Sequence, residues 1–318
     1  MKKTISVFIV LVSLFSASVV FAQENESRGV GVSPLTFELT ANPGDTIGNK
    51  IKISNPTNEA VSIKMEAEDF VPIGEEGEVV TTTEEDEDTT YSIRKWITIV
   101  PNEFTLKKGE QKQIDFIIEV PKDAEPGGKY GSILAGISGF TEDVAGATVS
   151  TKTGALVLLM VAGDTKEELD VKDFSAPSFQ EYGPVPFEIK FENNGTVHAK
   201  PKGYIVINDW FGRNVAELEL PQKNVMPGAV RKVETKWHTK WLFGKYTASF
   251  IGVFGNSNEN LRSSVITFWV FPWKLTLAVF VVLAIIFTII FLSRKRLKLA
   301  AKILFKGEHH VIKNLPKK

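Results

Sequence analysis

Apolar and polar residues alternate along most of this chain, and the alternation limits what it can fold into. Residues 47–53, 62–67, 113–120 and 148–161 all follow it. Because successive side chains of a strand point to opposite faces, period two predicts strands with one face on a core and the other in water. Turn-forming Pro, Gly, Asn and Asp cluster between these segments, at residues 42–45, 55–58, 107–110 and 125–128. Strands and turns at such intervals are typical of a β-sandwich.

The pattern restarts after a short polar link at residues 162–168. Seven more strands are predicted, at residues 171–174, 186–192, 200–208, 215–220, 231–237, 245–254 and 263–270. Seven strands in about 100 residues are enough for an immunoglobulin-like sandwich. We therefore expect an all-β fold with two tandem immunoglobulin-like β-sandwiches, one at residues 23–168 and one at 169–271, followed by a transmembrane helix at 272–293.

Both ends of the chain carry long apolar runs. Lys2 and Lys3 precede an apolar stretch at residues 5–20 and small residues near Ala22. This three-part pattern predicts a cleaved signal peptide at residues 1–22. Near the other end, residues 275–292 contain no charge. As a helix they would span about 27 Å, close to the ~30 Å hydrocarbon core of a bilayer. The sequence thus predicts an exported protein with one membrane span.

The charge distribution sets the expected orientation. The tail, residues 294–318, has nine Lys or Arg and one acid, Glu308. Positive charge beside a span stays cytoplasmic, whereas Trp269, Trp273 and Lys274 suit the opposite interface. We therefore predict a single-pass type I protein of the cell membrane, its ectodomain outside. The tail is either a stop-transfer signal with a solvated extension or a basic amphipathic helix on the inner leaflet.

Composition also excludes several function classes. The ectodomain has a net charge of about −11, which argues against nucleic acid and leaves neutral glycans and proteins as partners. The chain has no Cys, so thiol catalysis and Cys-ligated metals are excluded. Its two ectodomain histidines, His198 and His238, are forty residues apart, and no Gly-x-Ser-x-Gly elbow is present. We predict no enzyme activity, no catalytic residues, no cofactor and no metal site.

Three other features of the sequence are interpreted as structural rather than as binding sites. Acidic runs at residues 75–78 and 84–88 predict a solvated loop, with weak binding of a cation such as Ca²⁺ or of a basic partner as the alternatives. Trp96 is assigned to the core. Residues 127–132 are rich in glycine, but they lack the Gly-Lys-Ser/Thr that opens the helix of a phosphate-binding loop.

Aromatic residues gather in predicted loops of the second sandwich. Trp210 and Phe211 fall in a turn, and Trp237, Trp241 and Phe243 surround the loop at residues 238–240. Because exposed aromatic side chains stack on sugars and anchor protein interfaces, these five residues are the candidate surface for a glycan or protein partner. The alternative is that Trp237 ends a core strand and Trp241 packs over the end of the sandwich.

A family resemblance rests on turn phrases in the first sandwich. They are the residues 31–34 (GVSP), 42–45 (NPGD), 54–57 (SNPT), 101–110 (PNEFTLKKGE) and 120–127 (VPKDAEPG). With a signal peptide, two sandwiches, one span and a Lys-rich tail, the chain resembles the WxL-interacting proteins of bacterial cell surfaces. The resemblance implies that the first domain binds peptidoglycan or another cell-wall glycan. It implies that the second recognises partners, including surface proteins with WxL motifs.

The same phrases also resemble those of periplasmic pilus chaperones, which hold subunits by donating a strand. Those chaperones are soluble, and their paired Arg and Lys cannot be placed in this sequence. The alternative function is therefore a membrane-anchored, chaperone-like protein that holds secreted subunits by β-strand addition.

Overall fold

The structure is a computed structural model that describes residues 29–82, 89–138, 142–144, 147–149 and 152–306. Side chains are described for residues 29–82, 89–138 and 152–294. The predicted signal peptide, the acidic run at residues 84–88 and the tail from residue 307 onward lie outside the described residues. The chain divides into two compact units between Lys166 and Glu167, except that residues 74–77 belong to the second unit. Domain 1 holds the strands before this point, and domain 2 holds those after it with the C-terminal helix.

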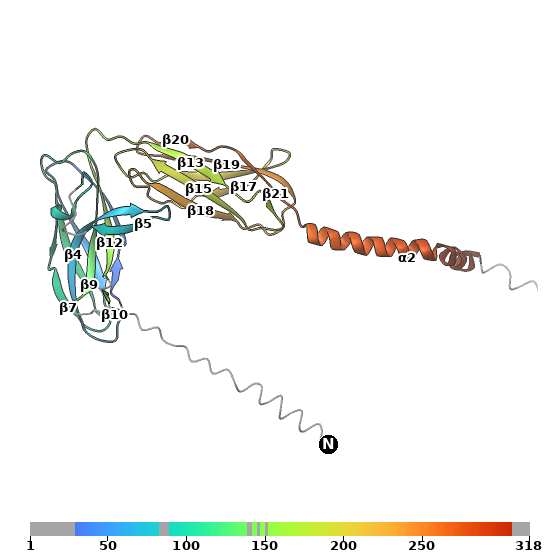
Figure 1. The fold of residues 1–318 in the computed structure, drawn as a ribbon, viewed down its shortest axis with the longest axis horizontal. Helices are drawn as coiled ribbons and strands as arrows, with labels where there is room; N and C mark the ends of the chain where they lie inside the picture. Colours follow the sequence, from blue (N-terminus) through green and yellow to red (C-terminus); the bar gives the residue numbers. More distant parts are fainter. Residues whose placement is uncertain (1–28, 83–88, 139–141, 145–146, 150–151, 307–318) are drawn as a thin grey trace, which may run out of the picture. The chain divides into compact units, whose positions relative to one another are not determined.

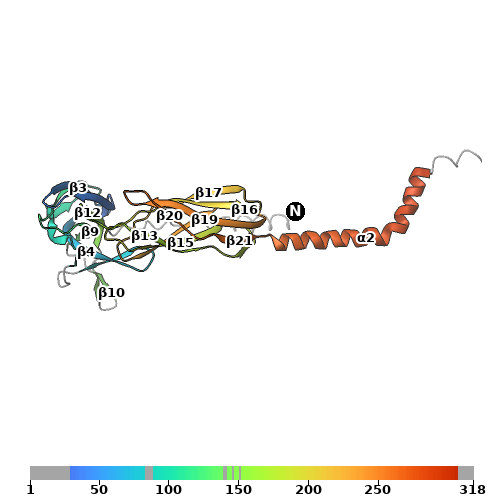
Figure 2. The same ribbon diagram turned by 90° about the horizontal axis from the view of Figure 1, so that it is seen from above.

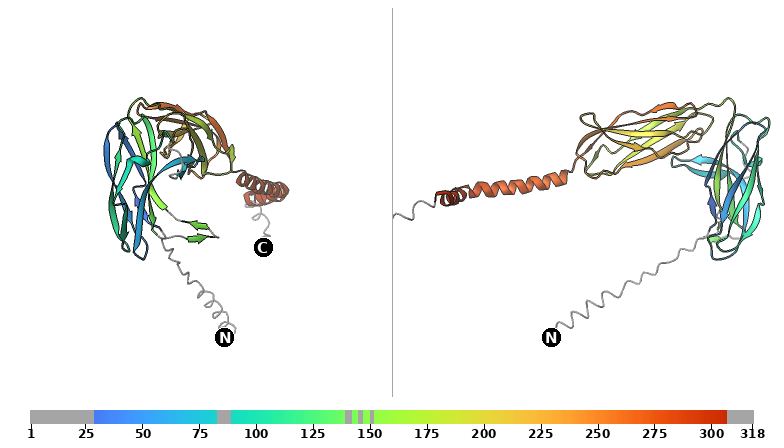
Figure 3. Two further views of the ribbon diagram at one scale, coloured as in Figure 1. Left: turned by 60° about the vertical axis from the view of Figure 1, so that its left-hand side comes forward. Right: turned by 180° about the vertical axis from the view of Figure 1, so that it is seen from behind.

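Domain 1 consists of two packed sheets (Figures 1 and 3). One sheet has the order β1 (Gly31–Ser33), β3 (Thr46–Ser54), β8 (Gln111–Glu119) and β6 (Ile97–Val100). The other has the order β2 (Thr36–Ala41), β12 (Lys152–Val161), β9 (Gly127–Ile137), β4 (Val61–Ile73) and β5 (Glu78–Thr82), with β7 (Glu103–Leu106) also paired to β4. β10 (Glu142–Val144) and β11 (Ala147–Val149) form a separate hairpin.

The core of domain 1 lies between these sheets, as the alternation predicts. In β8, Ile114, Phe116 and Ile118 are buried while the residues between them are exposed. Phe116 meets Phe37 of β2 edge to face, with 5.0 Å between ring centroids. The two sheets therefore share one continuous apolar core, and the predicted sandwich is confirmed.

Strand β9 departs from the alternating pattern. Its first seven residues are all buried, so this part of the strand is covered on both faces. A Cβ added at Gly131 would lie 2.5 Å from Cγ2 of Ile93, so a glycine is needed where the segment before β6 crosses the strand. The turn expected at residues 125–128 is shorter than predicted, since β9 already begins at Gly127.

Domain 2 is a second sandwich, with nine strands. One sheet has the order β13 (Leu169–Ser175), β15 (Val185–Asn193) and β18 (Val230–Trp237). The other has the order β14 (Phe179–Gln180), β21 (Ile266–Val270), β19 (Gly244–Phe254), β16 (Lys202–Asp209) and β17 (Asn214–Glu219), with β20 (Glu259–Arg262) also paired to β19. The seven predicted strands are present, and the two short strands β14 and β20 are additional.

The two sheets of domain 2 meet through phenylalanines. Phe187 packs on Phe268 with ring centroids 5.6 Å apart, and Phe191 packs on Phe250 at 5.5 Å. In each pair one ring comes from β15 and the other from the opposite sheet. Alternation again places these rings inside, because every second residue of β15 is buried.

In each domain, a buried asparagine fixes one turn by hydrogen bonds. In domain 1, the Nδ2 of Asn55 donates hydrogen bonds to the carbonyls of Glu59 and Leu106, at 2.7 and 3.1 Å. In domain 2, the Nδ2 of Asn193 donates to the carbonyls of Val197 and Val225, at 2.9 and 2.8 Å. Such bonds satisfy the buried amide of the asparagine and tie its turn to the neighbouring backbone. The Asn-containing turn phrases of the sequence therefore fix loops to the core.

The chain continues into one long helix, α2 (Trp273–Lys306). Its first 22 residues, to Arg294, contain an 18-residue stretch with a mean hydropathy of 3.1 and are long and apolar enough to cross a membrane. Only Phe271 and Pro272 separate β21 from α2, and Figure 2 shows α2 leaving domain 2 at the end where β21 finishes. The expected architecture of two β-sandwiches and one C-terminal apolar helix is confirmed. Because α2 continues to Lys306, the basic segment after the span is helical, as the amphipathic-helix alternative requires.

Candidate functional site

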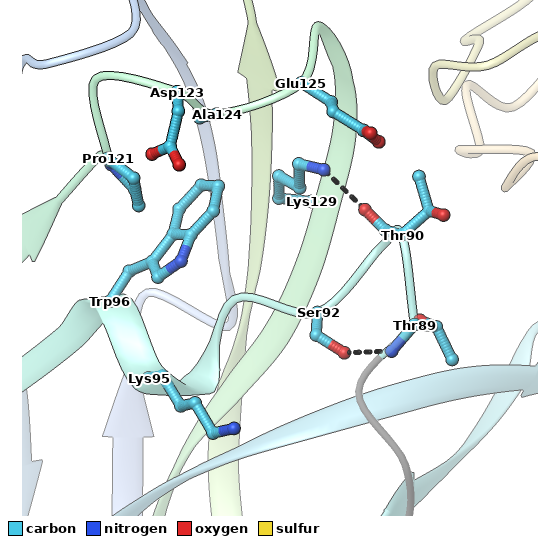
Figure 4. Close-up of a pocket in the computed structure, with 10 residues that line it drawn as sticks. All are labelled: Thr89, Thr90, Ser92, Lys95, Trp96, Pro121, Asp123, Ala124, Glu125 and Lys129. Carbon is cyan, nitrogen blue, oxygen red and sulfur yellow. Dashed lines mark hydrogen bonds between the residues drawn. The ribbon is translucent and has the colours of Figure 1, made fainter.

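A cavity of about 290 Å³ opens at one end of domain 1. Figure 4 shows its lining: Thr89, Thr90, Ser92, Lys95, Trp96, Pro121, Asp123, Ala124, Glu125 and Lys129. They come from the segment before β6, which includes the short 3-10 helix η1 (Arg94–Trp96), from the β8–β9 loop, and from β9. Its volume is near the lower limit of ligand pockets, about 300 Å³, so it suits one sugar ring or a similarly small group.

A buried carboxylate holds the first of these segments in place. Asp69 of β4 is 5% exposed, and its Oδ1 accepts hydrogen bonds from the backbone N–H groups of Ile93 and Arg94, both at 2.8 Å. Its Oδ2 lies 3.6 Å from Nε of Arg94. Asp69 therefore satisfies the N–H groups at the start of η1, and so sets the direction in which η1 presents Trp96.

Trp96 provides the aromatic wall of the cavity. It is half-buried and packs against the apolar core. The prediction that Trp96 belongs to the core therefore holds for the part of the side chain that faces inward. The rest of the side chain lines the cavity. In Figure 4, Pro121 and Asp123 lie beside its indole ring. A fixed, partly exposed indole is a common platform for the apolar face of a sugar.

Lys129 provides a buried cation beside this indole. The residue is 4% exposed, its Nζ lies 5.7 Å from the centroid of the Trp96 ring, and it donates a hydrogen bond to the Thr90 carbonyl at 2.5 Å. Burial lowers the pKa of Lys129 below its ordinary value of 10.5, and the charge of Glu125 opposes this shift. An ammonium in this position can donate to a ligand oxygen as well as to Thr90.

The lowered pKa of Lys129 predicts a pH dependence of stability. Above its pKa in the folded protein, the unfolded chain binds more protons than the folded one, so this group makes the free energy of unfolding rise with pH towards pH 10.5. As the pH rises through the alkaline range towards 10.5, the wild type should therefore gain stability relative to the Lys129→Met variant. Chemical denaturation of both proteins over this range measures the difference, and curves that stay parallel would contradict it.

The remaining lining groups are polar and mostly exposed. Asp123 and Glu125 carry carboxylates, Thr89 and Thr90 carry hydroxyls, and Ser92 Oγ accepts a hydrogen bond from the Thr89 N–H at 2.8 Å. Carboxylates and hydroxyls accept hydrogen bonds from sugar hydroxyl and amide N–H groups. Together with the indole and the ammonium, they could bind a small polar ligand that has one apolar face.

The aromatic residues predicted as a partner surface lie in domain 2 and divide into two groups. Trp210, Phe211, Trp241 and Phe243 are between 64% and 70% exposed. Trp237 is only 6% exposed and belongs to the core, where it meets Tyr246 edge to face at 5.2 Å. The assignment of Trp237 to the surface is therefore wrong. As the last residue of β18 it points into the sandwich, which is the alternative in which Trp237 ends a core strand. Trp241 contacts Tyr182 at 5.5 Å and remains open to solvent.

The other predicted features are placed as follows. Within the described side chains, no group of three or more His, Asp or Glu could hold a metal ion. The acidic run at residues 75–78 belongs to the β4–β5 hairpin. The cavity of domain 1 was not predicted from the sequence. The one feature of the sequence that could have indicated it is Trp96, which follows Lys95 and was assigned to the core.

Comparison with protein families decides the relationship of domain 1. Residues 33–136 match the family described as WxL Interacting Protein, peptidoglycan binding domain. The resemblance to WxL-interacting proteins is confirmed. The match begins in β1 and ends in β9, and it includes every residue that lines the cavity. The family is described as a binding domain, and the match applies to this segment of the chain.

Comparison with solved structures gives similarities of low sequence identity. The class 5 fimbriae chaperone CfaA is 14% identical, with 77% of this chain and 100% of that chain covered and a TM-score of 0.37. The Escherichia coli chaperone DraB is 11% identical, with 77% and 97% covered and a TM-score of 0.34. The periplasmic chaperone SfaE is 11% identical, with 76% and 100% covered and a TM-score of 0.33. The search of curated proteins found no match.

Proposed function

We propose that this protein is a non-enzymatic, membrane-anchored surface protein whose domain 1 binds cell-wall peptidoglycan in the cavity beside Trp96. One observation carries the proposal: the segment that matches a peptidoglycan-binding domain contains the whole cavity. Peptidoglycan has sugar rings with apolar faces, N-acetyl groups and carboxylates. The indole of Trp96 can stack on the apolar face of a sugar ring. The hydroxyls and carboxylates of the cavity can accept hydrogen bonds from the N-acetyl N–H, and the Lys129 ammonium can donate to a ligand carboxylate.

The acidic ectodomain is compatible with this ligand. With a charge of about −11, it would be repelled by strongly anionic wall polymers, so contacts at short range have to provide the affinity. We therefore expect salt to affect binding only weakly. Orientation completes the proposal: the basic tail remains cytoplasmic, and both sandwiches face the wall as the ectodomain of a type I protein.

Co-sedimentation with purified peptidoglycan sacculi tests the proposed function. The full chain in detergent micelles is expected to pellet with intact sacculi and to stay in the supernatant when the sacculi are first digested with a muramidase. Addition of soluble glycan fragments should release it. Raising the salt to about 0.5 M, where exposed charges are strongly screened, should leave most of it in the pellet.

Failure of the full chain to sediment would overturn the proposal. Recognition of other surface proteins, such as those with WxL motifs, would then be the leading function, with strand addition to secreted subunits beside it. Complex formation between the ectodomain and unfolded secreted subunits would favour strand addition. Complexes with folded surface proteins would favour partner recognition.

A further inference from the structure

Four exposed aromatic side chains lie at one end of domain 2. Strand pairing fixes this end: Asp209, the last residue of β16, pairs with Tyr246 near the start of β19, and Gly244 pairs with Val270, the last residue of β21. Trp210 and Phe211 follow β16 directly, and Trp241 and Phe243 directly precede β19. We call these four residues the aromatic rim: Trp210, Phe211, Trp241 and Phe243.

The apolar helix starts at the same end. Two residues join β21 to α2, and even fully extended they reach only about 7 Å. Phe271 of this link contacts Phe243 of the rim, with ring centroids 5.1 Å apart. Lys274 Nζ lies 2.8 Å from Oε2 of Glu181 in domain 2. The end of the sandwich is thus tied to the first turn of the helix.

The rest of the rim lies close beside this point. β16 is the second strand from β21, with β19 between them, so at a strand spacing of about 4.8 Å the turn with Trp210 and Phe211 is about 10 Å from the end of β21. In Figure 2, β16, β17 and β21 reach the end of domain 2 from which α2 leaves. Any bilayer that α2 enters therefore has its surface within reach of all four side chains.

The chemistry of this end also suits a lipid surface. Trp is enriched at the level of the lipid headgroups, where its amphipathic ring is buried beside polar groups, and Trp and Phe both occur on the apolar face of segments that lie in this layer. Lys240 is exposed and lies with its Nζ 5.9 Å from the centroid of Trp241, and Arg213 lies over the ring of Phe211 at 5.2 Å. Cations beside interfacial aromatic rings can contact lipid phosphates.

We propose that the aromatic rim docks the end of domain 2 onto the phospholipid headgroup layer of the membrane that α2 crosses. Trp269 and Trp273, both about half-exposed, extend the same belt along the chain. The rim then acts with the span, so that domain 2 is held against the bilayer rather than swinging on its two-residue link. This assigns the rim to lipid instead of to a glycan or protein partner, and it does not depend on what domain 1 binds.

Single-site labelling tests this docking, because the chain has no native Cys. A polarity-sensitive fluorophore is attached to Phe211→Cys in the full chain, which is reconstituted in vesicles of phosphatidylcholine and phosphatidylglycerol with nitroxide-labelled headgroups. The matched control is Ser257→Cys, an exposed turn residue beyond the opposite end of β19. Docking predicts quenching about threefold or more stronger at position 211 than at position 257.

A second pair of variants separates docking from mere proximity. Trp241→Ser with Phe243→Ser should reduce the quenching at position 211 about twofold or more, because Trp210 is then the one aromatic ring of the rim that remains in the labelled protein. Tyr204→Ser with Ile251→Ser should not, since these exposed residues pair with each other across the open face of the same sheet. Equal quenching at positions 211 and 257, or a signal at 211 unchanged by loss of Trp241 and Phe243, would overturn the proposal.

Discussion

Replacement of Asp69 by alanine is expected to lower the free energy of unfolding of domain 1 by about 3 kcal/mol, because the change removes a buried carboxylate that pairs with Arg94 and accepts two backbone hydrogen bonds. The two N–H groups at Ile93 and Arg94, which now donate to Asp69 at 2.8 Å, would also lose their acceptor. Amide hydrogen exchange in β8 and β9 reports the opening of this domain alone, and we expect it to become about 100-fold faster.

Asp115→Ala is the matched control for this substitution. Its carboxylate also forms an ion pair, with Lys50 at 3.5 Å, but both side chains are mostly exposed. Exposed pairs contribute about 0–1 kcal/mol, so exchange should change by less than about fivefold. If the two variants accelerated exchange equally, the role of Asp69 as the anchor of η1 would be wrong.

The second large effect is expected at Trp96. The Trp96→Leu variant keeps an apolar side chain against the core but removes the aromatic face, and it should weaken binding to sacculi about 10- to 100-fold, as is typical for a tryptophan at the centre of an interface. The reason is that the indole is held by η1 and lines the cavity, so little ordering is needed when a sugar stacks on it.

The control for Trp96→Leu is the same change in domain 2. Trp241 is 64% exposed, and Trp241→Leu should leave binding to sacculi within about twofold of the wild type, because exposed residues away from a site have small effects. Both variants are compared for folding by hydrogen exchange. Loss of binding in Trp241→Leu but not in Trp96→Leu would place the wall contact in domain 2 and contradict the cavity as its site.

Most of the fold could be predicted because alternation is a local signal. β8 and β15 each bury every second residue, and a strand with one wet face carries its structure in its own sequence. The apolar run of α2 is similarly direct. Strand β9 does not alternate, since it is covered on both faces, and its glycines were therefore interpreted as a turn.

The candidate site was harder to predict, because it is assembled from three separated segments. The contact of Lys129 with Thr90 joins residues that lie 39 positions apart, and the anchoring of η1 depends on Asp69 of another strand. No local pattern indicates such contacts. The predicted site residues were instead the most aromatic loop segments. Four of the five are indeed exposed, whereas Trp237 is buried, because its position as the last residue of β18 continues that strand's inward alternation.

Photo-crosslinking of a soluble peptidoglycan fragment to the full chain, followed by peptide mapping, tests the central claim most directly. The fragment carries its photoreactive group on the sugar, so that labels mark the residues that surround the ring. The account predicts adducts concentrated in residues 89–96 and 121–129 and their loss in Trp96→Leu. Adducts confined to domain 2, or spread evenly over both domains, would contradict it.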